Sequence, residues 1–138
     1  MRLLGQREHS RLELERKLVA YEEVPGTLAQ ALDELQAAGY LSEDRVAESL
    51  VHRRASRLGA GRLRQELQAK GLARELVEET IAGLQGSELE RARAVWARRY
   101  GQVPANAQER ARQTRFMLAR GFSGAIVRQV LGGGGDEP

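Results

Sequence analysis

The sequence predicts an all-α protein made of three tandem three-helix repeats, elongated and curved, and three observations lead to this fold class. Apolar residues recur with a period of about 3.6 along most of the chain, and no segment alternates apolar and polar residues as a strand would. Helix-capping patterns return at intervals. A short motif also returns after 49 and 50 residues, a spacing typical of stacked repeats.

Capping residues place the helix starts and ends. Ser42 and Ser123 are expected caps, each preceded by an apolar residue at the spacing of a hydrophobic staple. Gly39, Gly71 and Gly121 close helical stretches in the left-handed conformation that glycine adopts readily. We expect about nine short helices and no strand. Three segments fit the capping box, in which a polar side chain accepts from a free helix N–H and a Glu reaches back: Ser10-x-x-Glu13, Ser87-x-x-Glu90 and Asn106-x-x-Glu109.

The repeat is clearest between residues 67–72 and 117–122, where LQAKGL matches MLARGF at an offset of 50. An apolar residue follows four positions after each motif, at Leu76 and Ile126. A less similar copy occupies residues 18–24, which begins 49 residues before the second copy. We therefore divide the chain into three-helix repeats over 1–41, 42–86 and 87–131, followed by a Gly-rich tail over 132–138 that is expected to be disordered.

Composition excludes several classes of function. The 138 residues contain no cysteine, which excludes disulfides, thiolate metal sites and thiol catalysis and favours a cytoplasmic location. No apolar run approaches about 20 residues, so no membrane span is expected. Only His9 and His52 are histidines, and the two do not form a pair at metal-ligand spacing on a helix face. His9 stands beside Ser10, whose hydroxyl already has a capping role. We expect no enzyme activity, no metal and no cofactor.

Two motifs admit a functional interpretation but fit a structural one better. Gly59-Ala60-Gly61 could suggest a phosphate loop, yet no strand precedes it and no Gly-Lys follows, so we interpret it as a helix–helix turn. Trp96, the only tryptophan, lies at helical spacing with Ala92 and Tyr100. This spacing favours a place in the core, the alternative being stacking on a base or on an arginine.

The arrangement of charge is more informative than its net value of +3. Of the 22 basic residues, only Lys17 and Lys70 are lysines. Residues 52–64 contain five arginines and no acid, and residues 91–128 contain nine arginines and one acid. Residues 1–41 instead carry five basic and seven acidic side chains. Because arginine forks bind phosphates and carboxylates, we expect a basic binding face on the second and third repeats.

The predicted face follows helical spacing. Arg53 and Arg57 are i, i+4 neighbours, and the turn after them presents Arg62 and Arg64 close by. The alternative is ordinary solvation with pairing to nearby glutamates, which the scarcity of acids in these segments disfavours. The whole predicted binding face comprises Arg53, Arg54, Arg57, Arg62, Arg64, Lys70, Arg98, Arg99, Arg112, Arg115 and Arg120.

Four short motifs follow one another along the chain: REHSRLEL (7–14), GYLSEDRVA (39–47), GAGRLRQEL (59–67) with Lys70-Gly71, and RFMLARGFS (115–123). With these motifs the chain, from about Arg7 to Leu131, resembles the RecX family of RecA regulators, which has three repeats of three helices. Each motif is short, but they are specific together because they occur in the family's order and separation. The chain departs from the family pattern at residues 21–25, where an acidic pair replaces a basic residue and glycine, and at Val46, where phenylalanine is common.

The resemblance implies a function and partners. RecX-like proteins bind the RecA filament on single-stranded DNA in its groove and suppress ATP hydrolysis, strand exchange and recombination. The implied partners are therefore RecA and, weakly or through RecA, single-stranded DNA, and we expect a monomer. The alternative is a stand-alone helical nucleic-acid-binding domain, whose DNA affinity would fall steeply with salt. In either case repeats two and three are expected to make most of the contact.

Overall fold

The computed structural model describes residues 7–132 and is all-α, as predicted, with no strand in that range. Eight α-helices and two 3₁₀ helices are found there, against the nine or so helices expected. None of these helices is long and apolar enough to span a bilayer. In chain order the elements are α2 (Arg11–Leu18), η1 (Val19–Tyr21), α3 (Thr27–Ala37), α4 (Glu43–Arg54), α5 (Ala60–Ala69), α6 (Arg74–Ala82), η2 (Gln85–Ser87), α7 (Glu88–Arg99), α8 (Ala107–Ala119) and α9 (Gly124–Val130).

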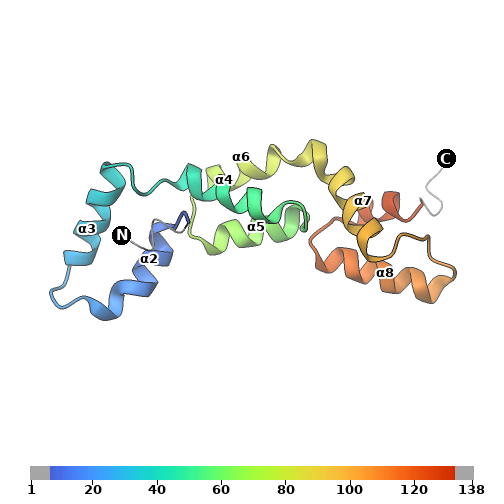
Figure 1. Ribbon diagram of the computed structural model, residues 1–138, viewed down its shortest axis with the longest axis horizontal. Helices are drawn as coiled ribbons and strands as arrows, with labels where there is room; N and C mark the ends of the chain where they lie inside the picture. Colours follow the sequence, from blue (N-terminus) through green and yellow to red (C-terminus); the bar gives the residue numbers. More distant parts are fainter. Residues whose placement is uncertain (1–6, 133–138) are drawn as a thin grey trace.

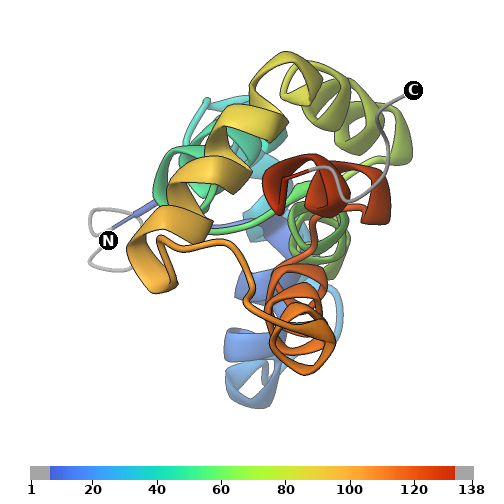
Figure 2. The ribbon, with the colours of Figure 1, turned by 90° about the vertical axis from the view of Figure 1, so that its right-hand side faces the viewer.

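The helices form an elongated arch, which confirms the predicted shape. Figure 1 shows α2 and α3 at one end, α4 to α6 in the middle and α7 to α9 at the other end. Viewed along the long axis, the three groups lie one behind another (Figure 2). Each group has its own cluster of buried apolar side chains, so no single core runs through the molecule.

The middle and C-terminal groups are built alike. Helices α4 and α7 each have 12 residues and begin 45 residues apart. Helices α5 and α8 each end one residue before a cation, which is followed by glycine at φ +79° (Gly71) or +97° (Gly121). The next residues, Leu72 and Phe122, are buried. The motif repeated at an offset of 50 therefore marks the same turn in both groups.

The N-terminal group matches this plan less closely. Helices α2 and α3 take the places of α5 and α6, but η1 and an extended Glu22 replace the glycine turn. Tyr21 and Val24 lie in the less similar copy of the motif, where equivalence to residues 67–72 predicts that Val24 is buried like Leu72. They are instead 78% and 60% exposed, because the chain leaves the helix differently here. The repeat boundaries at 41 and 86 remain predictions, and the tail after Gly132 lies outside the described residues.

Most of the predicted caps are confirmed. Ser10 and Glu13 form the complete capping box, and the side chains of Ser42, Asn106 and Ser123 each accept from the backbone N–H three residues ahead. Ser87 is the exception: it lies in η2 with φ −107° and ψ −1°, and its hydroxyl donates to the Leu84 carbonyl. The predicted box at Ser87 is wrong because a 3₁₀ turn leads directly into α7.

A backbone joint connects the middle and C-terminal groups. The N–H of Gly59, at the start of α5, donates to the Arg120 carbonyl (2.8 Å), and the N–H of Gly61 donates to the Gly121 carbonyl (3.0 Å). Free N–H groups at one helix start are thus satisfied by carbonyls just beyond another helix end. A Cβ on Gly59 would lie 2.5 Å from the Gly121 backbone. The connection between α4 and α5 ends at Gly59, the N-cap of α5, and Ala60 and Gly61 already belong to that helix, so the predicted helix–helix turn reaches only as far as Gly59. Both glycines have a packing role that the sequence did not indicate.

The joint between the N-terminal and middle groups is built from the corresponding parts of those two groups, a helix start and the turn after a helix end. Here the start of α2 meets the turn after α5, where a Cβ on Gly71 would lie 2.9 Å from Leu12. Lys70 bonds the Glu13 carboxylate at 2.7 Å. His9 is buried beside this joint, and its Nδ1 lies 3.1 Å from the Arg7 carbonyl. The structural interpretation of His9 and Ser10 is therefore confirmed.

Candidate functional site

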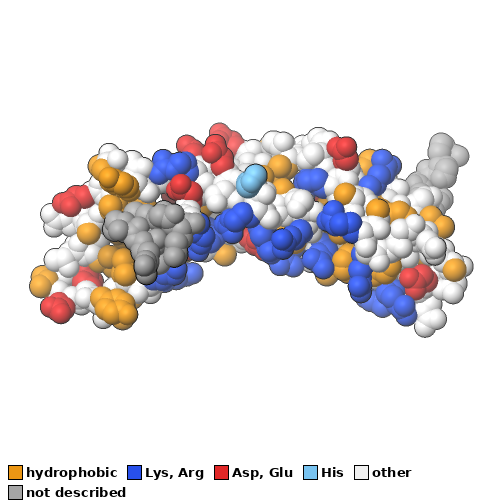
Figure 3. All heavy atoms as spheres, in the orientation of Figure 1, with side chains coloured by type: hydrophobic (Ala, Val, Ile, Leu, Met, Phe, Trp, Pro, Cys, Tyr) orange, Lys and Arg blue, Asp and Glu red, His pale blue; other side chains and the backbone are white. Residues whose placement is uncertain are grey.

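Cationic side chains gather across the middle of the arch and along its concave edge. Figure 3 shows this concentration of Lys and Arg, with carboxylates more frequent on the opposite edge. Two hollows contain most of the predicted basic face. We call them the C-terminal hollow, lined mainly by α7 and α8, and the middle hollow, lined by α4 and α5.

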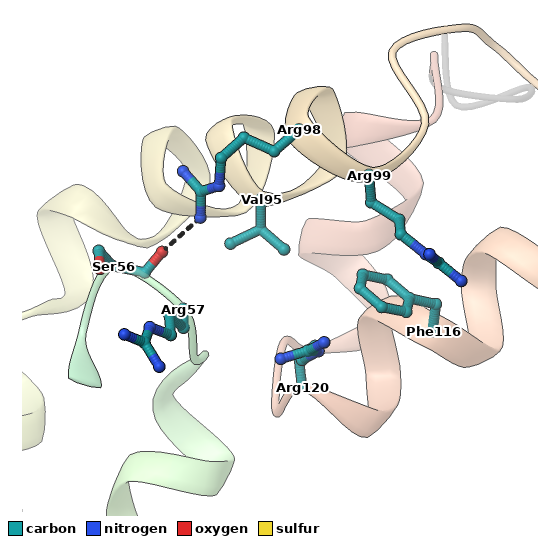
Figure 4. A pocket seen from close by; sticks show the side chains of 7 residues that line it. All are labelled: Ser56, Arg57, Val95, Arg98, Arg99, Phe116 and Arg120. Carbon is teal, nitrogen blue, oxygen red and sulfur yellow. Dashed lines mark hydrogen bonds between the residues drawn. The ribbon is translucent and has the colours of Figure 1, made fainter.

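The C-terminal hollow encloses about 410 Å³ and brings together four of the predicted residues, Arg57, Arg98, Arg99 and Arg120. Arg57 comes from the loop between α4 and α5, Arg98 and Arg99 from the last turn of α7, and Arg120 from the cap of α8. Figure 4 shows them arranged around Val95 and Phe116, with Ser56 at the edge. The hollow therefore combines a small apolar floor with a ring of guanidinium groups.

Short contacts hold three of these arginines in place. The Arg98 guanidinium donates to the Ser56 carbonyl at 3.0 Å (Figure 4). The guanidinium carbons of Arg99 and Arg120 lie 5.3 and 4.7 Å from the centre of the Phe116 ring, within cation–π range. Tyr100 packs edge-on against the same ring at 5.5 Å. The aromatic ring orients two cations without neutralising them.

No carboxylate neutralises the C-terminal hollow from within residues 7–132. The residues that line it include neither Asp nor Glu, and none of its four arginines has a carboxylate oxygen within 4.0 Å in this part of the chain. Four guanidinium groups in one concave surface create a strongly positive local potential. Such a surface can bind an anion with several oxygen atoms.

The middle hollow, of about 340 Å³, differs because it contains its own carboxylate. It is lined by Leu50, Arg53, Arg54, Glu66, Ala69 and Lys70. Arg54 holds Glu66 with two hydrogen bonds of 3.0 and 2.9 Å. These bonds lower the pKa of Glu66 below its ordinary value despite partial burial. Lys70 is paired with Glu13. Among the described residues, only Arg53 of these three cations lacks a carboxylate partner.

The remaining predicted residues lie outside both hollows. Arg62 is at the joint, where it donates to the Ala119 carbonyl and contacts Glu66. Arg64 forms a two-bond pair with Glu78 of α6, and Arg112 pairs with Glu109. Arg115 is exposed and lines neither hollow.

The expectation that acids are too scarce to pair is wrong for Arg54, Arg62 and Arg64, and Lys70, which lies outside the two Arg-rich segments, is paired as well. Their partners, Glu66, Glu78 and Glu13, are separated from them by four to 57 residues and come from several helices. Counting acids within a segment missed them because folding, rather than local sequence, places them there. The face that remains free of carboxylates is smaller than predicted and centred on the C-terminal hollow.

Sequence reasoning also missed residues that build the site. Arg91 belongs to the Arg-rich segment 91–128 but not to the predicted face; its guanidinium donates to the Ala55 and Leu58 carbonyls at 2.9 and 2.6 Å, and burial lowers its pKa. It fixes the loop that carries Arg57. Phe116 gave no local signal. The core role of Trp96 is confirmed: it packs on the C-terminal cluster, and its indole N–H donates to Gln113 at 2.8 Å.

No group of His, Asp or Glu side chains among the residues that the structure describes is arranged to hold a metal ion. His52 is exposed on α4, near Arg53 in sequence, and has no hydrogen bond within residues 7–132. The chemistry available at the concave face is therefore charge recognition by arginine.

Comparisons with known proteins assign the chain to a family. Models described as the second and third three-helix domains of RecX match residues 42–81 and 87–131. "Regulatory protein RecX" of Leptothrix cholodnii is 51% identical over 131 residues, covering 95% of this chain and 83% of that protein. The protein of the same name from Ralstonia nicotianae is 50% identical, covering 98% and 89%.

Solved structures agree at the level of the fold. A crystal structure of RecX from Lactobacillus salivarius superimposes with a TM-score of 0.76 at 19% identity, covering 94% of this chain and 88% of that one. Another, titled as regulatory protein RecX, gives a TM-score of 0.78 at 18% identity, covering 93% and 67%. The nearly full-length identity to the curated relatives is the stronger finding. The chain belongs to the RecX family, whose members are regulatory proteins rather than enzymes.

Proposed function

We propose that this protein binds the RecA filament formed on single-stranded DNA, lies in the filament's helical groove, and suppresses ATP hydrolysis and strand exchange. The observation that carries the proposal is the group of arginines in the C-terminal hollow, which has no carboxylate partner within residues 7–132, in an arch whose middle and concave edge are rich in cations (Figure 3). An elongated arch can contact successive protomers of a helical filament. A positive concave face is attracted to the phosphates that such a filament holds.

The proposed mechanism is differential binding. A ligand shifts a conformational equilibrium only as far as its affinities for the two states differ. Inhibition therefore requires that the protein prefer a less active arrangement of RecA protomers, or that it block growth of the filament. Three separate cores suit a ligand that follows a groove, since each group can fit its own protomer; a backbone joint connects the middle and C-terminal groups, and the Lys70–Glu13 contact connects the N-terminal and middle groups.

The groups are proposed to contribute unequally. The C-terminal and middle groups would make most of the contact, because Arg53, Arg57, Arg98, Arg99 and Arg120 lie there. The N-terminal group carries more acids than bases and would form a different contact or none. We also propose a cytoplasmic location for this protein, and one molecule would act as a monomer along the groove.

A charge reversal tests which face binds. We predict that Arg53→Glu combined with Arg57→Glu weakens co-sedimentation with RecA filaments by about tenfold or more, because two favourable charges become unfavourable. Both side chains are exposed and lack carboxylate partners in residues 7–132, so the helical circular dichroism spectrum is expected to stay intact.

The matched control for this test is Arg93→Glu with Arg128→Glu. It makes the same change in net charge at two exposed arginines that line neither hollow. The control is expected to co-sediment nearly as the unaltered protein does. Equal losses in both variants would show that net charge, rather than the concave face, governs binding.

The stand-alone nucleic-acid-binding function remains the second candidate, because the C-terminal hollow needs no RecA to attract an anion. It predicts that the protein binds single-stranded DNA as tightly alone as it binds the RecA filament. Its DNA affinity would fall steeply as salt rises, since phosphate contacts release counterions. Much tighter binding to the filament than to naked DNA would favour RecA as the partner.

A further inference from the structure

The two hollows on the concave face occupy corresponding places in the middle and C-terminal groups. Helices α4 and α7 correspond at an offset of 45, and the ends of α5 and α8 correspond at an offset of 50. Most lining residues therefore form pairs across the two groups: Leu50 with Val95, Arg53 with Arg98, Arg54 with Arg99, Glu66 with Phe116, and Lys70 with Arg120.

The decisive difference within these pairs is Glu66 against Phe116. In the middle hollow, Glu66 accepts two hydrogen bonds from Arg54 and lies 3.5 Å from Arg62. In the C-terminal hollow, the corresponding position is a phenyl ring, against which Arg99 and Arg120 pack. One group thus contains an oxyanion bound by arginine, and the other contains the arginines without the oxyanion.

We propose that the C-terminal hollow binds a backbone phosphate of a nucleic-acid strand, and that Glu66 occupies the corresponding place in the middle hollow as an internal substitute for such an anion. This inference rests on the proposed function, because it names the ligand class of the same concave face. If this proposal holds, one residue in each hollow decides whether an outside anion can bind there: Phe116 leaves the C-terminal hollow open, and Glu66 fills the middle hollow.

The chemistry of the hollow favours a phosphodiester over an acidic protein segment. Two arginines are enough to satisfy a planar carboxylate, as Arg54 and Arg62 do for Glu66 in the middle hollow. The C-terminal hollow presents four guanidinium groups from three segments of chain, which approach from different directions (Figure 4). A phosphate is tetrahedral, so its oxygen atoms point in several directions, and the next phosphate along the strand adds further oxygen atoms. Guanidinium planes also provide stacking surfaces for unpaired bases.

The test uses the whole protein without RecA and measures fluorescence anisotropy of a labelled single-stranded oligothymidylate. Phe116→Glu places a carboxylate between Arg99 and Arg120, as Glu66 stands beside Arg54. We expect affinity to fall by about tenfold or more and the slope of log affinity against log salt to fall by about 1 to 2. Leu118→Glu is the control, since it adds the same charge to α8 at an exposed position outside the hollow.

The reciprocal variant cannot be explained by misfolding, because it should gain binding. Glu66→Gln frees Arg54 and Arg62 in the middle hollow, and we expect oligothymidylate affinity to rise by about threefold to tenfold. The control, Glu78→Gln, makes the same charge change by freeing Arg64 outside both hollows. Circular dichroism melting of each variant verifies that the fold is retained.

Three results would overturn the proposal. The first is that Phe116→Glu and Leu118→Glu weaken binding equally. The second is that Glu66→Gln gains no more than Glu78→Gln. The third is that polyglutamate displaces the oligonucleotide as well as inorganic polyphosphate of equal charge, which would mean that the hollow does not select phosphate.

The same variants separate this inference from the proposed function. If the protein co-sediments with RecA filaments while the oligonucleotide results match any of those three outcomes, the phosphate site is wrong and the RecA function stands. If the oligonucleotide results follow the expectation but the protein does not co-sediment with RecA, the RecA function is wrong and the phosphate site stands.

Discussion

Single residues at the joints decide how the groups of helices are held together, and Glu13 is the clearest example. Its carboxylate accepts from Arg7 and Lys70, both at 2.7 Å, and from the Ser10 backbone N–H at 2.8 Å. Burial alone would raise its pKa, but these three hydrogen bonds outweigh burial and lower the pKa to about 2. Glu13 thus links the helix cap of α2 to the middle group through Lys70.

Replacing Glu13 by Gln should therefore destabilise the protein in a pH-dependent way. Because the pKa of Glu13 is lower in the folded protein than in the unfolded chain, its carboxylate stabilises the fold above about pH 5, and this contribution disappears as the pH falls toward about 2. We expect Glu13→Gln to lower the free energy of unfolding by about 1–3 kcal/mol near neutral pH, measured by urea denaturation.

The control for this prediction is Glu15→Gln, on the same helix. Glu15 forms a more exposed pair with Arg11, so its replacement should have a smaller effect. A stability difference between Glu13→Gln and the unaltered protein that stays constant from about pH 7 to about pH 2 would contradict the account, since linkage requires it to shrink.

Residue-level prediction from sequence succeeded where the signal was local. The helix caps could be predicted because the side-chain oxygen that accepts and the backbone N–H that donates are only three residues apart, as at Ser10, Ser42, Asn106 and Ser123. The sequence did not predict contacts between distant segments. Examples are the ion pair of Arg54 with Glu66 and the hydrogen bond from Arg91 to the Ala55 carbonyl. Extending the repeat motif by one residue would have exposed the contrast of Glu66 with Phe116.

At the scale of elements, helix periodicity and glycine turns carried most of the information. All eight α-helices fall within predicted helical stretches, and Gly39, Gly71 and Gly121 have the expected positive φ. What periodicity could not show is how α5 and α8 meet. That contact is made by backbone atoms of glycine, which have no side-chain pattern to detect.

The glycine joint makes a specific prediction. Gly59→Ala would place a Cβ 2.5 Å from the Gly121 backbone, which cannot move without disturbing the turn after α8. We expect a loss of about 1–3 kcal/mol or more of stability and weaker coupling between the middle and C-terminal groups, seen as a lower melting temperature and a broader transition.

Gly86→Ala is the matched control, because nothing lies within 4 Å of the position of its Cβ. It should leave the melting temperature unchanged or raise it slightly. Equal destabilisation by both alanine substitutions would show that the close approach of Gly59 to Gly121 has no energetic role.

At the scale of the whole molecule, the separate cores and the curved stack explain why the sequence shows a repeat rather than one continuous amphipathic pattern. The elongated, curved shape followed from the repeat, because units that bury their apolar faces on neighbours stack in one direction. The repeat did not predict which arginines lack a carboxylate partner within residues 7–132, because acids from three other helices neutralise several of the predicted cations. The basic face is therefore a property of the assembled arch.

Restraint of RecA on single-stranded DNA can be measured as the rate of ATP hydrolysis by RecA. We expect this protein, added at less than one molecule per RecA protomer, to lower the steady-state rate, and we expect Arg53→Glu with Arg57→Glu to restore most of it while Arg93→Glu with Arg128→Glu does not. An unchanged rate at micromolar concentrations of the folded protein would contradict the proposed function.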